Sequence, residues 1–69
     1  MTYGEVLSYY LEKMGIKPAE LARRVGISRG QVSDLMSGRT QDPTLSRAKA
    51  IADAIGVTLQ EMADMMDED

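Results

Sequence analysis

Residues 17–36 read KPAELARRVGISRGQVSDLM and contain two short helical patterns separated by a turn. Pro18 suits the first turn of a helix, because its missing N–H would be unpaired there in any case. Gly26 suits the left-handed position that follows a helix C-terminus. Ser28 and Gln31 have the spacing of a capping box, which marks the start of a second helix. The stretch therefore predicts two helices joined by a tight, glycine-containing turn.

Apolar residues recur at helical spacing on one side of each of these helices. The positions expected to face the core are Leu21, Ala22 and Val25 in the first helix and Val32, Leu35 and Met36 in the second. The second helix is expected over residues 29–37, since Gly38 follows it. Two short helices that cross at a tight turn form a helix-turn-helix, which commonly lays its second helix in the major groove of DNA.

A helix is also expected on the N-terminal side of this stretch. Thr2 and Glu5 have capping-box spacing, so the helix should start near Tyr3, and Gly15 should end it. Its apolar residues recur as the stripe of an amphipathic helix: Val6, Leu7, Tyr10, Leu11 and Met14.

Two more helices are expected on the C-terminal side, after a loop at 38–43 that contains Gly, Asp and Pro. Thr44 should cap the first of them. Thr58 and Glu61 form a capping box for the second, and Val57 and Met62 are placed as its hydrophobic staple. The expected apolar positions are Leu45, Ala48, Ile51, Ala52 and Ile55 in the first and Leu59, Met62 and either Met65 or Met66 in the second.

These elements predict an all-α fold, because no run of residues alternates with period two. Sixty-nine residues make one small domain. We expect residues 1–66 to form this single helix-turn-helix domain, followed by an acidic, disordered tail at 67–69.

The chain has neither cysteine nor histidine. Disulfides, thiolate metal sites and Cys nucleophiles are thereby excluded, and zinc, iron or copper sites and His-based catalysis are disfavoured. No P-loop or dinucleotide fingerprint is present, so we expect no enzyme, no metal and no cofactor. No apolar run approaches the ~20 residues of a membrane span and no signal peptide is visible, so we expect a cytoplasmic protein with no membrane partner.

Charge is distributed unevenly, although the net charge is −3. Residues 13–49 hold all eight basic side chains and only three acidic ones, which gives this segment a net charge of +5. DNA binding depends on the local field at the contact face, so a basic middle between acidic ends is compatible with it. The basic residues are Lys13, Lys17, Arg23, Arg24, Arg29, Arg39, Arg47 and Lys49.

The segments PAELA (18–22), VGIS (25–28) and VSDLMSG (32–38), with Pro43 and AIADAIGV (50–57), occur in an order and spacing that resembles the phage repressor and Cro-type (Xre-like) family of helix-turn-helix domains. The resemblance implies a compact five-helix repressor-like bundle, DNA binding, and a bacterial, phage or archaeal origin. Pro18 stands where the family often has a DNA-contacting Gln, and Lys13 where it often has an Arg near the end of its first helix. Both departures imply weaker or differently composed DNA contact.

The helix at 29–37 turns five residues away from its apolar side: Arg29, Gly30, Ser33, Asp34 and Ser37. Arg29 is the strongest candidate for base recognition, because a guanidinium can bind guanine O6 and N7 together, worth ~1–3 kcal/mol of discrimination. The alternative is an ordinary solvated arginine, although its charge opposes the helix dipole in the first turn.

The remaining candidates have less specific roles. Gly30 could let the backbone approach DNA or could simply be tolerated, and Asp34 could accept from cytosine N4 or be a solvated acid. Ser28 and Gln31 are expected to cap the helix, although Gln31 could still reach DNA, and Ser33 is a minor contact. Phosphate contacts are expected from Lys17 and Arg39, and the resemblance adds the loop residues Thr40, Gln41 and Thr44. Arg47 and Lys49 are expected to be a solvated face.

The sequence thus predicts a sequence-specific DNA-binding transcriptional regulator, expected to be a repressor, whose partner is double-stranded DNA read in the major groove by residues 29–37. Proteins of this class often bind as two-fold dimers, so a homodimer on a two-fold operator is expected, joined through the loop at 38–43 and the last two helices. The alternative is a protein-interaction module with weak or no DNA binding, which the acidic total and Met62, Met65 and Met66 favour. The basic stripe favours DNA.

Overall fold

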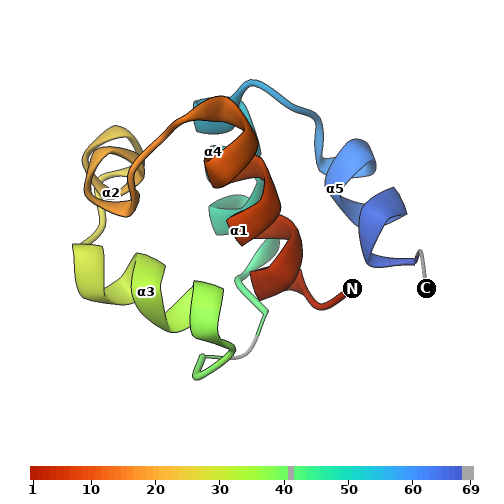
Figure 1. The fold of residues 1–69 in the computed structure, drawn as a ribbon, viewed down its shortest axis with the longest axis horizontal. Coiled ribbons are helices and arrows are strands. Elements are labelled where there is room, and N and C mark those ends of the chain that lie inside the picture. Colours follow the sequence, from red (N-terminus) through yellow and green to blue (C-terminus); the bar gives the residue numbers. More distant parts are fainter. Residues whose placement is uncertain (41, 68–69) are drawn as a thin grey trace.

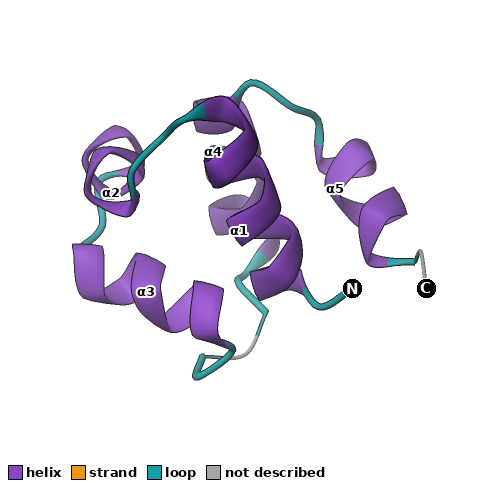
Figure 2. Cartoon of the chain, viewed as in Figure 1, coloured by secondary structure: helices purple, strands orange, loops and turns teal. Residues whose placement is uncertain are grey.

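The computed structural model describes residues 1–40 and 42–67. Five α-helices account for most of them (Figure 1): α1 Tyr3–Met14, α2 Pro18–Val25, α3 Arg29–Ser37, α4 Leu45–Ile55 and α5 Leu59–Met66. The described residues contain no strand (Figure 2). The predicted all-α fold and the predicted bounds of the second motif helix are therefore confirmed.

The helices begin where the sequence predicts because local hydrogen bonds fix their first turns. In α3, the Ser28 hydroxyl accepts from the Gln31 N–H at 3.1 Å, and the Gln31 side chain accepts from the Ser28 N–H at 2.9 Å. The same reciprocal pair joins Thr2 to Glu5 in α1 and Thr58 to Glu61 in α5. Thr44 caps α4 by accepting from the Arg47 N–H at 3.3 Å. Each pair satisfies N–H groups that a helix start leaves unpaired.

The turn between α2 and α3 depends on Gly26. Its φ of 84° lies in the left-handed region, which glycine enters without a Cβ clash. The Gly26 N–H donates to the Ala22 carbonyl at 2.8 Å and closes the end of α2. The chain can therefore reverse within three residues and start α3 at an angle to α2.

The helices pack in two groups. α3 contacts α2 and α1, whereas α5 contacts α1 and α4. Figure 1 shows α3 and α5 on opposite sides of the pair formed by α1 and α4. The ammonium nitrogen of Met1 donates to the Met66 carbonyl at 3.2 Å, so the chain start lies beside the end of α5.

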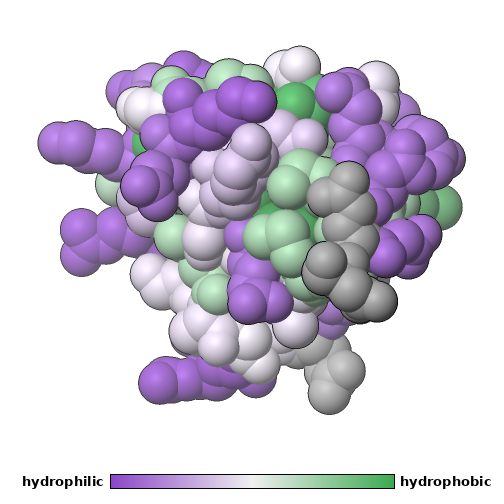
Figure 3. Space-filling model, turned by 45° about the vertical axis from the view of Figure 1, so that its right-hand side comes forward, coloured by the Kyte–Doolittle hydropathy of each residue, from purple (hydrophilic) through white to green (hydrophobic). Residues whose placement is uncertain are grey.

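The apolar stripes merge into one core. Val6, Leu7, Leu21, Val32 and Ile51 are fully buried and come from four different helices. The other buried apolar residues are Tyr3, Tyr10, Leu11, Ala22, Leu35, Ala52, Ile55, Val57 and Met62. On the face of the molecule shown in Figure 3, a small apolar area is exposed among mostly hydrophilic side chains.

Three expectations about the apolar stripes need correction. Met14 is 44% exposed because it lies in the last turn of α1, where Gly15 diverts the chain away from the core. Leu45 is 76% exposed because it occupies the first turn of α4, before the part of that helix that packs. Met65 and Met66 both pack partly against the core, rather than one of the two.

Arg24 fixes α2 to α4. Its Nη1 donates to the Ala54 carbonyl at 3.1 Å, and its Nη2 donates to the Glu20 carboxylate at 2.9 Å. Arg24 is therefore held by two partners, whereas the side chain of Arg23 is 78% exposed with a longer Glu20 contact of 3.6 Å.

Among the described residues, no helix combines the length and hydropathy that crossing a bilayer requires. Asp67 follows α5 and its N–H closes that helix, while residues 68–69 of the predicted acidic tail lie outside the described part of the chain.

Candidate nucleic-acid interface

The core positions of α3 decide which of its residues face outward. Val32 and Leu35 are buried and Met36 is partly buried. At 100° per residue, Gly30, Asp34 and Ser37 fall opposite this apolar side. Arg29, Gly30, Ser33 and Ser37 are exposed, and Asp34 is half-buried. Gly30, Ser33, Asp34 and Ser37 therefore share the outward face of α3, and Arg29 lies at the edge of that face in the first turn.

Arg29 occupies the first position of α3 with an exposed side chain. Within the described chain, no hydrogen bond or ion pair holds its guanidinium. Among residues 1–40 and 42–67, Arg29 has no carboxylate partner, whereas Arg23, Arg24 and Arg39 each have one. Arg29 can therefore present both edges of its guanidinium fork to an acceptor pair outside the protein.

Small residues fill the middle of the outward face. A Cβ on Gly30 would meet only the Ser28 Oγ at 3.8 Å, which is ordinary contact distance, so nothing in the described chain requires glycine there. Ser33 and Ser37 are also small and exposed. The α3 backbone can therefore approach a flat or grooved surface closely.

Ser28 and Gln31 are partly committed to the cap, as predicted. The Ser28 hydroxyl and the Gln31 Oε1 are both used in the capping box. The Gln31 Nε2 has no such partner in the described chain, so Gln31 retains two donors for an external acceptor.

The end of α3 is linked to the loop that follows it. The Asp34 carbonyl accepts from the Thr40 N–H at 3.2 Å and from the Ser37 hydroxyl at 3.3 Å. The Asp34 carboxylate lies 3.9 Å from the Arg39 guanidinium, which is a loose, exposed pair. Arg39 and Thr40 are thus held beside the outward face of α3, while the predicted contact at Gln41 lies outside the described residues.

Lys17 immediately precedes α2 and is exposed. No side chain caps this helix, and Pro18 at its first position has no N–H to donate. The Glu20 and Leu21 N–H groups donate to the Lys17 carbonyl, so Ala19 has the N–H of this first turn that stays available at the positive end of the α2 dipole, next to Lys17 in sequence.

Arg47 is a candidate that sequence reasoning placed on a solvated face. It is instead half-buried and lines a surface cavity of about 330 Å³ together with Gln31, Thr40 and Thr44. Its position beside the α3 face depends on how α4 packs, so no local pattern could have shown it. Lys49 is exposed and pairs with Asp53 at 3.0 Å, as a solvated residue would.

Comparison with protein families matches residues 7–62 to the helix-turn-helix family. The chain is 41% identical over 64 residues to Repressor protein C of Rhizobium phage 16-3. This match covers 93% of this chain and 24% of that protein. The NMR structure of the DNA-binding domain of the P22 c2 repressor matches with a TM-score of 0.86 and 22% identity over 91% of this chain and 82% of that one. The biofilm regulator SinR, solved in complex with DNA, matches with a TM-score of 0.83 and 18% identity over 90% of this chain and 98% of that one.

Proposed function

The chain belongs to the helix-turn-helix family, and from this premise we propose that residues 1–66 form the DNA-binding domain of a sequence-specific transcriptional repressor. The observation that supports this most directly is the outward face of α3. It combines small side chains with Arg29, which has no hydrogen bond or ion pair among the described residues, and Arg39 lies beside its other end. That arrangement suits a helix that enters the major groove.

The proposed contacts divide into base recognition and phosphate positioning. Arg29 contacts base edges, with Gln31, Ser33 and Ser37 as further candidates, and Gly30 allows close approach. Asp34 limits the choice of base and holds Arg39 loosely. Lys17, Arg39, Thr40 and Gln41 contact phosphates, and Ser28 keeps the first turn of α3 in place. Arg47 joins the phosphate contacts from α4.

The proposal extends to a homodimer on two half-sites ~34–36 Å apart. A single module buries only ~600–1,000 Å² against DNA, so one domain alone binds weakly. The exposed Leu45 supports an interface at the start of α4. The chain spans 24% of the length of the phage repressor that it matches. Any dimer contacts made outside these 69 residues therefore belong to the proposal as well.

The proposed role is binding rather than catalysis, and we place it in the cytoplasm, where repressors meet DNA. The lack of histidine and cysteine in the sequence supports a role without nucleophile–base chemistry.

The test is an NMR titration of the ¹⁵N-labelled protein with random-sequence duplex DNA, first at low salt and then at higher salt. We expect salt-sensitive shifts at Lys17, at residues 28–37 and at Arg39, because phosphate contacts weaken as salt rises. Selection of a binding sequence from a random library then identifies the operator. Absence of shifts at low salt would refute DNA binding and favour a protein partner instead.

A further inference from the structure

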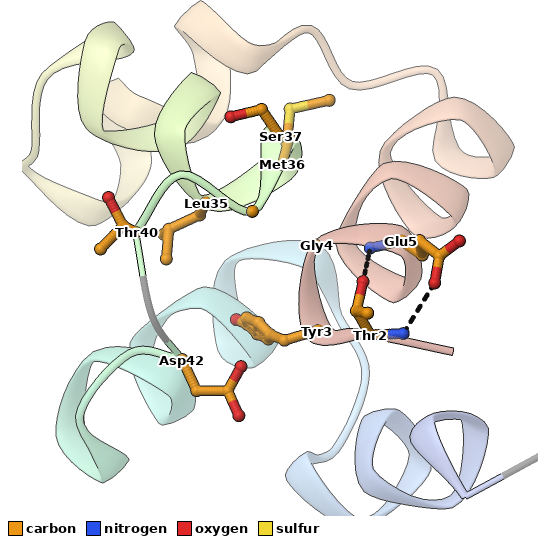
Figure 4. A pocket seen from close by; sticks show the side chains of 10 residues that line it. Thr2, Tyr3, Gly4, Glu5, Leu35, Met36, Ser37, Thr40 and Asp42 are labelled. Carbon is orange, nitrogen blue, oxygen red and sulfur yellow. Dashed lines mark hydrogen bonds between the residues drawn. The ribbon is translucent and has the colours of Figure 1, made fainter.

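Gly4 is buried in the first turn of α1, against the last turn of α3. A Cβ on Gly4 would overlap the Leu35 carbonyl oxygen and would lie 2.7 Å from the Met36 carbonyl oxygen. Both are backbone atoms, so no side-chain rotation can make room. Figure 4 shows Gly4 beside the end of α3 that carries Leu35, Met36 and Ser37.

Gly30 provides an internal comparison for this position. Gly4 and Gly30 both occupy the second helical position after a capping box, in the sequences TYGE and SRGQ. Neither has a positive φ, and a Cβ on Gly30 would meet only the Ser28 Oγ at an ordinary contact distance of 3.8 Å. The need for glycine at position 4 therefore comes from the approach of α3 and not from the cap.

The contact at Gly4 is local. Next to it, the start of α1 and the end of α3 line a surface cavity of about 490 Å³ that extends to Thr40 and Asp42. Gly4, Leu35 and Met36 all line this cavity, so the close backbone approach at Gly4 lies at the edge of an open space between α1 and α3. The last turn of α3 is therefore held at Gly4 by a backbone contact and not by surrounding side chains.

Of the two helices, α3 is the one that should move. Val6 and Leu7 anchor the first half of α1 and are fully buried. In α3, the residues after Leu35 are only half-buried or exposed. Ordinary contact begins near 3.4 Å, so relief of the overlap requires a displacement on the order of 1 Å at the end of α3. Binding constellations need to be held within ~0.5 Å.

We propose that Gly4 is a positioning residue for DNA recognition: the absence of its side chain sets the height and tilt of α3, and with them the position of the outward face from Arg29 to Ser37. The part of this inference that concerns DNA recognition rests on the proposed function. The displacement of α3 can be measured without DNA.

The first measurement compares Gly4→Ala with Gly30→Ala by NMR in the absence of DNA. We expect Gly4→Ala to shift amide signals across residues 33–40 and to lengthen the proton contacts between residue 4 and residues 35 and 36. Gly30→Ala adds the same methyl where it makes only an ordinary contact with Ser28, so its shifts should stay within the first turn of α3. Shifts of Gly4→Ala that stay within α1 would overturn the proposal.

The second measurement compares affinity for the selected operator with affinity for random duplex, at a temperature where each protein is folded. For Gly4→Ala we expect operator affinity to fall by a factor on the order of ten, as for loss of one bidentate base contact, while affinity for random duplex changes little. The control is Ile55→Val, which lowers stability within α4, away from α3, and should leave the ratio of the two affinities unchanged. An unchanged ratio for Gly4→Ala would also overturn the proposal.

The two measurements separate this inference from the proposed function. If the wild-type protein selects no operator, the proposed function fails, and the NMR comparison still decides whether Gly4 positions α3. If Gly4→Ala does not fold, chemical synthesis with D-alanine at position 4 adds a methyl but leaves empty the position that meets the Leu35 and Met36 carbonyl oxygens. A folded D-alanine protein with the wild-type signals at 33–40 supports the proposal, and a folded one whose signals at 33–40 are shifted overturns it.

Discussion

Arg29 begins α3 with an exposed guanidinium that no hydrogen bond or ion pair holds within the described chain. Arg29→Ala should therefore cost little stability and should lower operator affinity by ~1–3 kcal/mol, the worth of one bidentate base contact. Preference should relax at one base pair. Affinity measurements on operators with single base changes, with Arg23→Ala as the exposed-arginine control, test this. Retention of full preference at every base pair by Arg29→Ala would refute its role.

Tyr3 carries a buried hydroxyl that has no hydrogen-bond partner in the described chain. Burial, and secondarily the nearby Asp42 carboxylate, raises the pKa of Tyr3 from 10.0 to about 12. An unsatisfied buried hydroxyl costs ~1–3 kcal/mol, so Tyr3→Phe should raise the free energy of unfolding at neutral pH.

The alkaline behaviour of Tyr3 gives a separate prediction. The pKa of Tyr3 is higher in the folded state than in the unfolded state. Ionisation of Tyr3 therefore leaves the free energy of unfolding unchanged below pH 10 and lowers it as pH rises from 10 through 12. Two pKa units correspond to about 2.7 kcal/mol. Urea unfolding at pH 8 and near pH 12 should therefore show the wild-type protein losing more stability than Tyr3→Phe. Equal losses in the two proteins would show that Tyr3 ionises as freely in the folded state as in the unfolded one.

At the scale of helices, the sequence predicts most of what the structure contains because the signals are local. A capping box needs residues three apart, and a glycine terminator acts on the helix that it follows. The bounds of α3 and the caps of α1, α4 and α5 depend on nothing further away. Burial depends on which helix packs on which. The sequence pattern therefore assigned Met14 and Leu45 wrongly to buried stripes.

The link between α2 and α4 is an example of what local patterns miss. Arg24 and the Ala54 carbonyl are thirty residues apart in sequence, and only the fold brings them to 3.1 Å. Arg24→Ala should lower the free energy of unfolding by ~1 kcal/mol, since the side chain is 42% exposed and the full ~1.5–3 kcal/mol of a charged hydrogen bond is reduced by solvent.

Arg23→Ala is the matched control for this prediction. It removes an adjacent arginine with the same partner, Glu20, but without a bond to α4, so its cost should stay below ~0.5 kcal/mol. Urea unfolding of both variants measures the difference. Equal costs would show that the contact with Ala54 adds nothing to stability.

At the scale of the whole molecule, the packing of the helices turns an uneven charge sequence into two separated regions. The basic middle of the chain supplies Lys17, Arg29 and Arg39 around α3, whereas α5 and the residue after it carry Glu61, Asp64 and Asp67. Sequence alone showed that the acidic and basic segments differ. It could not show that α3 and α5 lie on opposite sides of α1 and α4, because that depends on the packing of all five helices (Figure 1).

This separation predicts a dependence on salt. The molecule measures 29 × 24 × 22 Å, so DNA bound at α3 lies more than ~10 Å but less than ~30 Å from the charges on α5. The Debye length is ~10 Å at ~0.1 M salt and ~30 Å at ~0.01 M, so DNA feels these charges only at the lower salt concentration. The double change Asp64→Asn and Asp67→Asn should strengthen binding to random duplex at the lower salt and leave it unchanged at the higher salt. Asp34→Asn, on the proposed contact face itself, should strengthen it at both. If the α5 change strengthened binding equally at both salt concentrations, DNA would have to lie beside α5, and the face assigned to α3 would be wrong.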